Sequence, residues 1–233
     1  MQIVILCGGK ATRLQPLTKK TSKSMLVIEG KPFLEHQINL LKKNEIEDIV
    51  LCVGYKAEQI KDYFGDGKKF GVKIEYSQER KELLGTGGAL KKAENLLGND
   101  FLVMYGDSYL PFNFQEAIES FRKFDKFDLM VTYRNLNRYE PSNVAVEKGL
   151  VKSYSKKRKT KEMKYIDYGV GIFEKEALKI LPENTPCDLS QLYQPLIKRN
   201  QLLAFKSKTR FYTIGSFREL EEFKKYIKKV HNF

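Results

Sequence analysis

The chain has 233 residues, of which 42% are hydrophobic, and its 42 basic and 29 acidic residues give a formal net charge of +13. This length predicts one large domain, and because no apolar run reaches the ~18 residues of a transmembrane helix, we expect no membrane partner. The positive charge is spread along the chain, mostly on lysines and without a compact arginine-rich arm, so it favours small anionic substrates over nucleic acid.

Strand and helix patterns alternate through the first half of the chain. Short apolar runs predict strands at Gln2–Leu6, Ile49–Val53, Val72–Tyr76, Phe101–Tyr105 and Leu129–Tyr133. Amphipathic stretches between them predict helices at Pro32–Lys43, Ala57–Phe64, Ala89–Leu97 and Phe114–Lys123. This alternation predicts an α/β fold with a doubly wound, mostly parallel, Rossmann-like sheet, whose ligands bind at the carboxyl ends of the strands.

The second half changes character. We predict strands at Asn143–Glu147, Leu150–Tyr154, Ile166–Phe173, Leu202–Lys206 and Phe211–Ile214, and a helix at Leu189–Lys198. Ser216 and Glu219 predict a capping box before a last helix, whose apolar stripe is Leu220, Phe223, Ile227 and Val230. Because no repeat or linker separates the halves, we expect a single domain over residues 1–233, with halves of about 1–135 and 136–233.

Cysteine and histidine usage excludes several chemistries. Cys7, Cys52 and Cys187 form no C-x-x-C pair, and the first two lie in apolar strand patterns, which is typical of small buried hydrophobes in a reduced, cytoplasmic protein. His36 and His231 are the only histidines, so we expect neither a histidine-based triad nor a zinc cluster. The sequence starts directly with a strand pattern and shows no signal peptide.

The most informative segment follows the first predicted strand. Gly8 and Gly9 end the apolar run, Thr12 and Arg13 follow, and Lys23 comes ten residues after Arg13. Glycines let backbone amides approach a ligand, and a guanidinium binds phosphate oxygens in pairs. The spacing fits neither the dinucleotide fingerprint nor the P-loop. We therefore interpret the segment as another kind of polyphosphate-binding loop, with an ordinary surface turn as the alternative.

The run Gly8–Thr18, GGKATRLQPLT, followed by Lys23, resembles the signature of the sugar-phosphate nucleotidyltransferases, G-G-x-G-T-R-L-x-P-L-T and then P-K. Ala11 stands where that family usually has glycine, and Ser22 stands where proline usually precedes the lysine. The resemblance implies a nucleotidyltransferase or glycosyltransferase-A-like fold with a small sugar-binding β subregion. It also implies Mg²⁺ as cofactor, and a reaction that joins a nucleoside triphosphate to a sugar 1-phosphate and releases pyrophosphate.

The resemblance assigns roles to individual residues. Arg13 and Lys23 are implied as catalytic cations, Arg13 on the leaving phosphates and Lys23 between the two substrates. Gln78 occupies a place where the family often has a base-reading side chain, and its alternative is an exposed strand end. The implied nucleotide-binding residues are Leu6, Gly8, Gly9, Thr12, Arg13, Gln78, Gly85, Thr86 and Gly87. The last three open a predicted helix, whose N-terminus would attract an anion or serve as an ordinary glycine-rich helix start.

Asp107 follows an apolar strand and is the metal candidate, since phosphate-bound Mg²⁺ needs only one or two carboxylates. The alternative is a turn-forming aspartate. Thr213 stands where the family has a second carboxylate, in W-x-D-x-G-T, so the resemblance is incomplete there. Asp167 could serve instead, bind the sugar phosphate, or do neither. Lys156 falls at the position of a family lysine that holds the sugar phosphate, and a solvated basic loop is the alternative.

From the resemblance we expect a nucleotidyltransferase that makes nucleoside diphosphate sugars for cell-surface polysaccharides. The closest likeness is to enzymes that transfer a guanylyl group to a heptose-like or mannose-like 1-phosphate. Residues 1–135 would bind the nucleotide, and residues 136–233 the sugar phosphate. The alternatives are a cytidylyltransferase for a non-sugar phosphate and a nucleotide-binding regulatory subunit of low activity. The expected partners are the two substrates, with no nucleic acid and no membrane, and a homo-oligomer stays open.

Overall fold

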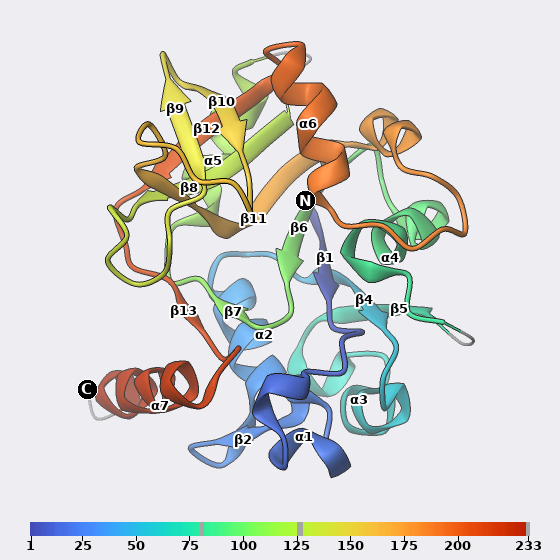
Figure 1. The fold of residues 1–233 in the computed structure, drawn as a ribbon. Coiled ribbons are helices and arrows are strands. Elements are labelled where there is room, and N and C mark those ends of the chain that lie inside the picture. Colours follow the sequence, from blue (N-terminus) through green and yellow to red (C-terminus); the bar gives the residue numbers. More distant parts are fainter. Residues whose placement is uncertain (80–81, 125–127, 232–233) are drawn as a thin grey trace.

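The computed structural model describes residues 1–79, 82–124 and 128–231. Within them, one large sheet has the strand order β5-β4-β1-β6-β11-β8-β12-β10-β9 (Figure 1). Its strands are β1 Gln2–Leu6, β4 Asp48–Val53, β5 Lys73–Gln78, β6 Asp100–Tyr105, β8 Asp128–Arg134, β9 Val144–Glu147, β10 Leu150–Tyr154, β11 Tyr165–Glu174 and β12 Leu202–Ser207. Two short antiparallel pairs lie outside it, β2 Val27–Ile28 with β3 Lys31–Pro32, and β7 Ser108–Tyr109 with β13 Tyr212–Thr213.

The sheet is parallel in its first half and mixed in its second. β5, β4, β1 and β6 are parallel neighbours, as the strand–helix alternation predicts. β11 then runs antiparallel to both β6 and β8, while β12 runs parallel to β8. Because β9 pairs with both β10 and β11, the last five strands close into a small barrel. The α/β class is confirmed, but the prediction of a mostly parallel sheet is wrong for the second half. There β11 lies antiparallel between β6 and β8, and β10 pairs antiparallel with both β9 and β12.

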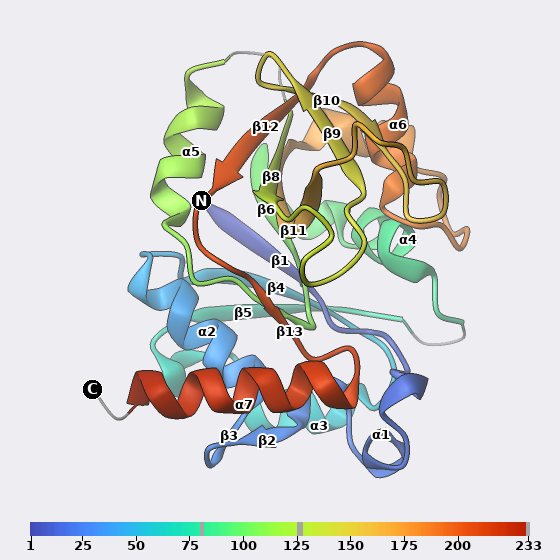
Figure 2. The same ribbon diagram turned by 60° about the vertical axis from the view of Figure 1, so that its left-hand side comes forward.

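Helices cover both faces of the sheet (Figure 2). They are α1 Leu17–Lys20, α2 Phe33–Lys43, α3 Ala57–Phe64, α4 Gly85–Lys92, α5 Phe114–Arg122, α6 Ser190–Lys198 and α7 Phe217–His231. Shorter 3₁₀ turns are η1 Thr12–Leu14, η2 Lys23–Met25, η3 Lys68–Phe70, η4 Glu94–Leu96 and η5 Lys175–Ile180. One core cluster joins the sheet to α2, α3 and α5, and another joins the opposite face to α4 and α6. Alternate side chains of a strand therefore enter different cores.

The predicted elements of the main sheet and its helices are all present, with ends displaced by a few residues. The largest displacement is at α4, which spans Gly85–Lys92 and not the predicted Ala89–Leu97. The glycines lower helix propensity, so the pattern alone places the start too late. The short elements α1, β2, β3 and β7 were not predicted, because two- to four-residue elements carry no periodicity.

The C-terminal helix α7 lies across α2 and the β2–β3 pair (Figure 2). Its Phe223 ring lies 5.1 Å from that of Phe33, edge to face, in a third apolar cluster with Leu220 and Ile227. Val230 is 43% exposed, so the predicted stripe is wrong at its last position. Burial of this stripe fixes the first turn of α7 beside the ends of the central strands.

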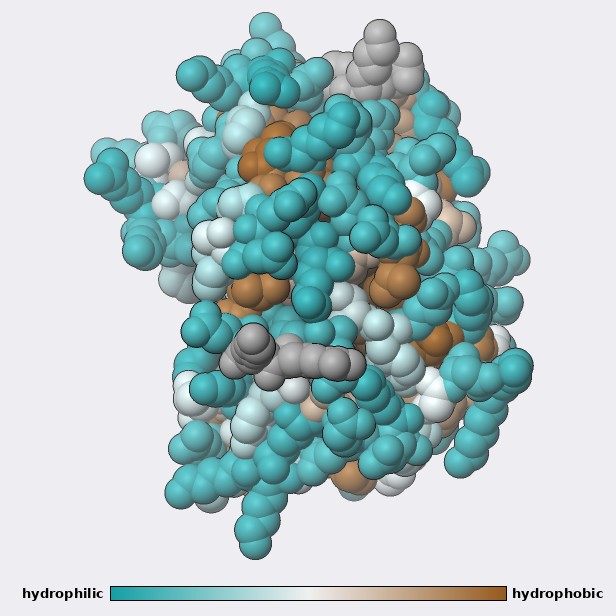
Figure 3. Space-filling view, turned by 90° about the vertical axis from the view of Figure 1, so that its right-hand side faces the viewer, coloured by the Kyte–Doolittle hydropathy of each residue, from teal (hydrophilic) through white to brown (hydrophobic). Residues whose placement is uncertain are grey.

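No helix of the described residues is long and apolar enough to cross a membrane. Cys7, Cys52 and Cys187 are buried free thiols, which confirms the prediction that the first two are small core residues. Figure 3 shows one face of the molecule, on which hydrophilic side chains dominate and the hydrophobic residues form small, separate patches. That face, apart from its grey atoms, has no broad apolar surface.

Candidate active site

The loop after β1 is braced from within. The Thr18 hydroxyl donates to the Ala11 carbonyl at 2.8 Å, and the Leu14 N–H donates to the same oxygen. Ala11 has φ +50°, in the left-handed region that favours glycine, which accounts for the glycine that related signatures have at this position. The alanine is accommodated, and the turn places Arg13 in η1, on the surface beside the strand ends.

The segment that carries Lys23 is tied to α3 and the loop before it. Gln59 accepts a hydrogen bond from the Ser22 N–H at 2.9 Å and donates one to the Lys20 carbonyl at 2.8 Å. The Tyr55 hydroxyl donates to the carbonyls of Thr18 and Lys19. A proline has no N–H and could not make the first of these bonds, so Ser22 contributes an anchor that the usual residue lacks.

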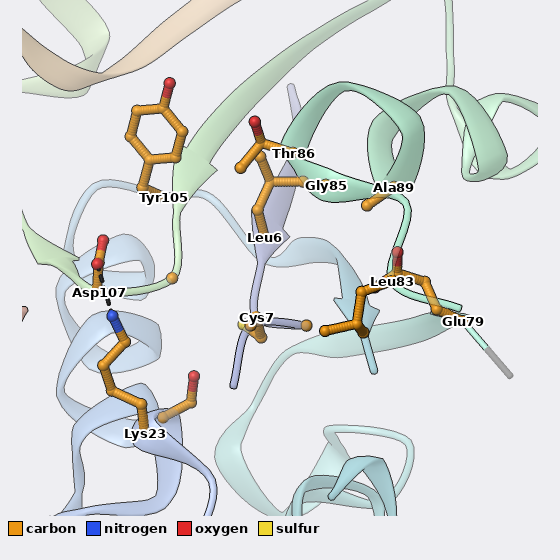
Figure 4. Close-up of a pocket in the computed structure, with 14 residues that line it drawn as sticks. Leu6, Cys7, Lys23, Glu79, Leu83, Gly85, Thr86, Ala89, Tyr105 and Asp107 are labelled. Carbon is orange, nitrogen blue, oxygen red and sulfur yellow. Dashed lines mark hydrogen bonds and ion pairs between the residues drawn. The ribbon is translucent and has the colours of Figure 1, made fainter. Parts of the chain in front are cut away.

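Two adjoining pockets open at the carboxyl ends of the central strands. We call the first the glycine-loop pocket (Figure 4). Its walls include Leu6, Gly8 and Gly9 from β1 and its loop, Lys23 from η2, Glu79 and Leu83 after β5, Gly85, Thr86 and Ala89 from α4, and Tyr105 and Asp107 from the end of β6. The combination of open backbone, apolar walls and one cation suits a ligand with a planar part and an anionic part.

Lys23 and Asp107 form an ion pair at one side of this pocket. The Lys23 ammonium lies 2.7 Å from Asp107 Oδ2, and the two side chains are 17% and 31% exposed. Burial raises the pKa of Asp107, but the charge and hydrogen bond of Lys23, helped by Arg13, outweigh it and hold that pKa below its ordinary value. Asp107 is therefore ionised at neutral pH, and Lys23 is held in place by a group that a phosphate oxygen can replace.

The second pocket, which we call the Asp167 pocket, shares Thr86, Tyr105 and Asp107 with the first. Its other walls include Arg13, Glu140, Asn143, Tyr154, Lys156, Asp167, Thr213 and Glu219. These residues come from η1, the barrel strands β10 and β11, the loops after β8 and β10, the short strand β13 and the first turn of α7. Lys23 and Asp107 thus lie close to the boundary of the two pockets, where ligands in each would meet.

Lys156 closes the Asp167 pocket from the loop after β10. Its ammonium lies 2.8 Å from Asp188 Oδ2 and 5.7 Å from the centre of the Tyr105 ring. Asp188 precedes α6 and also accepts the Ser190 N–H at 2.9 Å. Burial raises the pKa of Asp188, but the hydrogen bonds from Lys156 and Ser190 lower it by more, so the pKa lies below its ordinary value. The pair is about half exposed, so Lys156 can exchange Asp188 for another anion at little cost.

Asp167 contributes a desolvated carboxyl group to the same pocket. Burial raises its pKa to about 6, although the Gly169 N–H donates to its Oδ1 at 3.0 Å. Its own N–H donates to the Asn143 side chain at 2.8 Å, which fixes the strand at this point. A desolvated carboxylate whose pKa is raised accepts strong hydrogen bonds from the hydroxyl groups of a ligand.

Thr213, at the place where a second carboxylate was expected, is next to Asp107. β13 pairs Thr213 with Ser108, and the Ile214 N–H donates to the Asp107 carbonyl. The Thr213 hydroxyl donates to Glu219 Oε2 at 3.0 Å, and that oxygen also accepts the Gly215 N–H at 2.8 Å. Ser216 Oγ accepts the Glu219 N–H at 3.4 Å, which is one half of the predicted capping box. The Glu219 carboxylate takes its hydrogen bonds from Thr213 and Gly215 and so reaches back into the pocket wall.

The structure brings together most of the predicted site residues but leaves three away from the pocket walls. Thr12 is in η1, outside both pockets. Gln78 points to α3, where its side chain accepts from Lys61 at 2.5 Å and donates to Glu58 at 3.1 Å. Gly87 packs on the chain before α6, its N–H donating to the Cys187 carbonyl. A side chain there would overlap Cys187, so this glycine serves packing.

Several wall residues were not predicted from the sequence, notably Glu79, Tyr105, Asn143 and Glu219, and neither was Asp188, the partner of Lys156. For Glu79 a signal existed. Side chains alternate along a strand, and Ser77 is paired with Cys52 of the α4-side core, so Glu79 follows it to the α4 side while Gln78 points away. The others come from loops and helix starts that only the tertiary fold brings to the site.

Comparison with known proteins agrees with this geometry. The family described as Nucleotidyl transferase matches residues 2–229. A D-glycero-α-D-manno-heptose 1-phosphate guanylyltransferase of Campylobacter jejuni is 39% identical over 160 residues, 67% of this chain and 69% of that protein. The bifunctional protein GlmU of Methanococcus maripaludis is 31% identical over 221 residues, 92% of this chain and 51% of that protein. The chain thus spans about half the length of that second relative.

Among solved structures, HddC from Yersinia pseudotuberculosis superimposes with a TM-score of 0.82 at 27% identity, covering 97% of this chain and 99% of that one. The same protein complexed with GMP-PN gives a TM-score of 0.80. Because the family model matches almost the whole chain, residues 2–229, the protein belongs to the nucleotidyl transferase family of enzymes. This confirms the resemblance drawn from the glycine loop.

Proposed function

We propose that the chain joins a nucleoside triphosphate to a sugar 1-phosphate, with GTP as the nucleotide and a heptose-like or mannose-like sugar. The observation that carries this is the Lys23–Asp107 pair beside the boundary of two pockets. The glycine-loop pocket would take the nucleotide, and the Asp167 pocket the sugar phosphate. Similarity to a heptose 1-phosphate guanylyltransferase and to HddC supports the choice of base and sugar.

The transfer needs no general base in this arrangement. An oxygen of the sugar 1-phosphate, already an anion, attacks the α-phosphorus and forms a new P–O bond. The bond from the α-phosphorus to the β-phosphate oxygen breaks, and pyrophosphate leaves with the electron pair. The protein's task is to bring two polyanions together and offset their charge. Lys23 would bind where the two phosphates meet, and Lys156 would hold the sugar phosphate. Arg13 lines the Asp167 pocket near Asp107, so it would have to reach past this shared wall to bind the leaving phosphates.

A divalent cation fits at Asp107. No cluster of three or more metal-ligating side chains is found in residues 1–79, 82–124 and 128–231, so a metal would depend on ligand oxygens for most of its coordination. Mg²⁺ bound to phosphates is coordinated in this way, with only one or two protein carboxylates and several waters. Asp107 is ionised and lines both pockets. Bound there, Mg²⁺ would neutralise charge on the phosphates.

The binding of the sugar depends on the Asp167 pocket. Asp167 offers an acceptor beside Lys156, and Tyr105 and Tyr154 contribute ring surface to the pocket wall while their hydroxyl oxygens are buried. Such groups discriminate between sugars through their hydroxyl positions, because a buried polar group without a partner is costly. The quaternary ammonium end of phosphocholine has no hydroxyl groups to donate to Asp167, although its phosphate could still bind Lys156.

The decisive experiment measures pyrophosphate release over GTP, UTP, CTP and dTTP against heptose, mannose, glucose and N-acetylglucosamine 1-phosphates and phosphocholine. We expect release with GTP and a heptose or mannose 1-phosphate. Activity confined to CTP with phosphocholine would establish the alternative cytidylyl transfer. Nucleotide binding without release in any combination would support the second alternative, a regulatory subunit, for which the neutral Thr213 beside Asp107 is the motivating observation.

A further inference from the structure

Gln37 of α2 is a polar side chain at a core position. It lies on the apolar face of the helix, three residues after Leu34 and four before Leu41, and it is only 1% exposed. Burying an amide group away from water is costly unless the group makes hydrogen bonds. The contacts of Gln37 therefore have to account for a polar residue where the helix pattern calls for an apolar one.

The amide group of Gln37 donates to the segment that carries Asp107. Its Nε2 lies 2.8 Å from the Ser108 carbonyl oxygen and 3.4 Å from the Tyr105 carbonyl oxygen. Its Oε1 is buried and accepts no hydrogen bond from the residues that the structure describes. An unpaired buried acceptor lowers stability, so core packing does not account for this side chain. Its two donor hydrogens do, because each has an acceptor.

The Tyr105 carbonyl lies just past the end of a strand ladder. The last pair between β6 and β11 is Met104 with Val170, one residue before Tyr105. The next N–H of β11 in that register is that of Gly169, which donates to the Asp167 side chain at 3.0 Å and not across the ladder. Among the described strands, pairing therefore provides no donor for the Tyr105 carbonyl, and Gln37 provides one.

The Ser108 carbonyl points away from the short β7–β13 pair. The Asp107 carbonyl accepts the Ile214 N–H at 3.0 Å, so it faces β13. Successive carbonyl groups of an extended strand point in opposite directions, and that of Ser108 therefore faces α2, where Gln37 donates to it. The backbone around Asp107 is thus held from two sides, by Ile214 on one and by Gln37 on the other.

We propose that Gln37 is a positioning residue of the active site. It bonds the carbonyl groups two residues before and one residue after Asp107, and so fixes the direction in which that carboxylate extends. The carboxylate has to lie 2.7 Å from the Lys23 ammonium and also face both pockets (Figure 4). Gln37 itself lines neither pocket. The inference rests on the proposed function, in which Asp107 places Lys23 and holds the metal.

Gln37→Met removes the two hydrogen bonds and little else. Methionine has about the length of glutamine but no N–H or O–H, so both carbonyl groups lose their donor. A displacement of a catalytic group by about 1 Å can lower turnover about 10²-fold. We therefore expect turnover to fall about 10- to 100-fold. The KM for the nucleotide should change by less than about threefold, because the walls of the glycine-loop pocket stay in place.

The effect of Mg²⁺ on nucleotide binding reports the position of Asp107 without catalysis. Dissociation constants for GTP are measured by titration calorimetry in Mg²⁺ and in EDTA, and their ratio gives the Mg²⁺ enhancement. We expect the wild-type protein to bind GTP more tightly with Mg²⁺ and Asp107→Asn to lose most of this enhancement. Gln37→Met should reduce it about tenfold or more and leave binding in EDTA near the wild-type value.

Ile38→Val is the matched control for a purely structural effect. Ile38 is the next residue of α2, is fully buried in the core, and has an apolar side chain that offers no hydrogen bond to the backbone around Asp107. Loss of its methyl group should lower the urea midpoint while turnover and the Mg²⁺ enhancement stay at wild-type values. If Gln37→Met matches Ile38→Val in both readouts, Gln37 is a packing residue and the proposal is overturned.

Gln37→Glu decides the matter if Gln37→Met does not fold. Glutamate has the shape of glutamine but offers one donor at most, when protonated, so its turnover and Mg²⁺ enhancement should lie clearly below those of the wild type. Wild-type values in both would overturn the proposal.

Asp107→Asn separates this inference from the proposed function. If that variant keeps the full Mg²⁺ enhancement, the metal assignment fails, and the turnover of Gln37→Met against Ile38→Val decides the role of Gln37. If no substrate pair releases pyrophosphate, the proposed reaction fails, and the Mg²⁺ enhancement decides it.

Discussion

Replacing Lys23 by methionine tests the centre of the proposed site. Methionine keeps the length and much of the apolar stem of lysine but removes its charge. In the wild-type protein the ammonium is 2.7 Å from Asp107 Oδ2. The substitution leaves that carboxylate without its main cation, so both the free energy of unfolding and the turnover should fall. The two effects can be measured separately.

The size of each effect follows from the burial of the pair. Exposed ion pairs contribute about 0–1 kcal/mol, and breaking a buried one costs about 3–5 kcal/mol. With side chains 17% and 31% exposed, Lys23 and Asp107 lie between these cases, so Lys23→Met should lower the free energy of unfolding by about 2 kcal/mol at pH 7. Loss of one charge that stabilises a transition state lowers turnover by about 10²–10³-fold.

The stability contributed by the Lys23–Asp107 pair depends on pH in a direction that follows from the pKa of Asp107. The pKa of Asp107 is lowered in the folded protein, so its contribution is complete above the unfolded value of about 3.9 and is lost as the pH falls through the folded value. In Lys23→Met, burial still raises that pKa while the main opposing charge is gone. The stability difference between wild type and variant should therefore be largest near pH 7 and shrink toward pH 3.

Urea unfolding at pH 7 and near pH 3 measures the stability difference, and pyrophosphate release measures turnover. The matched control is Lys20→Met, which removes an exposed lysine at the end of α1 and should change neither. Adding Asp107→Asn to Lys23→Met should restore part of the stability and none of the activity. If Lys23→Met retains wild-type turnover, or loses equal stability at both pH values, the reasoning about this pair is refuted.

Other residues give shorter tests. Arg13→Ala should reduce turnover about 10²–10³-fold without loss of stability, because Arg13 is exposed in the free protein; near-normal turnover contradicts its role. Gly8→Ala should destabilise the fold by about 1–3 kcal/mol through overlap with Glu79, whereas Gly9→Ala meets nothing within 4 Å and should stay near wild type in urea unfolding. In the folded protein the Asp167 pKa of about 6 exceeds its unfolded value, so the wild-type free energy of unfolding falls as the pH rises from about 4 to 6. Asp167→Asn should therefore raise the free energy of unfolding above pH 6. The same variant should raise the KM for the sugar 1-phosphate, and an unchanged KM would exclude Asp167 from sugar binding.

Sequence periodicity predicted the part of the molecule that has long, regular elements. The ends of β1 and α3 are as predicted, because a buried four- or five-residue apolar run and a capped amphipathic stretch leave little choice. Glycine spacing at Gly8 and Gly9 predicted a ligand loop, and the structure places that loop at a pocket. These are local signals, and the structure retains them.

The rest depends on contacts between distant segments. Nothing in the pattern of Tyr165–Glu174 says that β11 runs antiparallel to β6, because a fully buried strand looks the same in either direction. The same holds for Asp188, which meets Lys156 only because α6 packs on β10. For Gln78, strand alternation predicts only that it and Glu79 point to opposite faces, and the register of β5 with β4 decides which face holds the pocket.

The closing of the barrel strands explains why the site has two pockets and not one. In the parallel half, β1, β4, β5 and β6 all end at one edge, which leaves a continuous rim for a single ligand. The antiparallel return of β11 brings Asp167 from the opposite chain direction to the end of β6, beside Tyr105 and Asp107. A second ligand can then meet the first at a shared wall. Transfer between two anions requires such a meeting place, and a uniformly parallel sheet would offer no second wall.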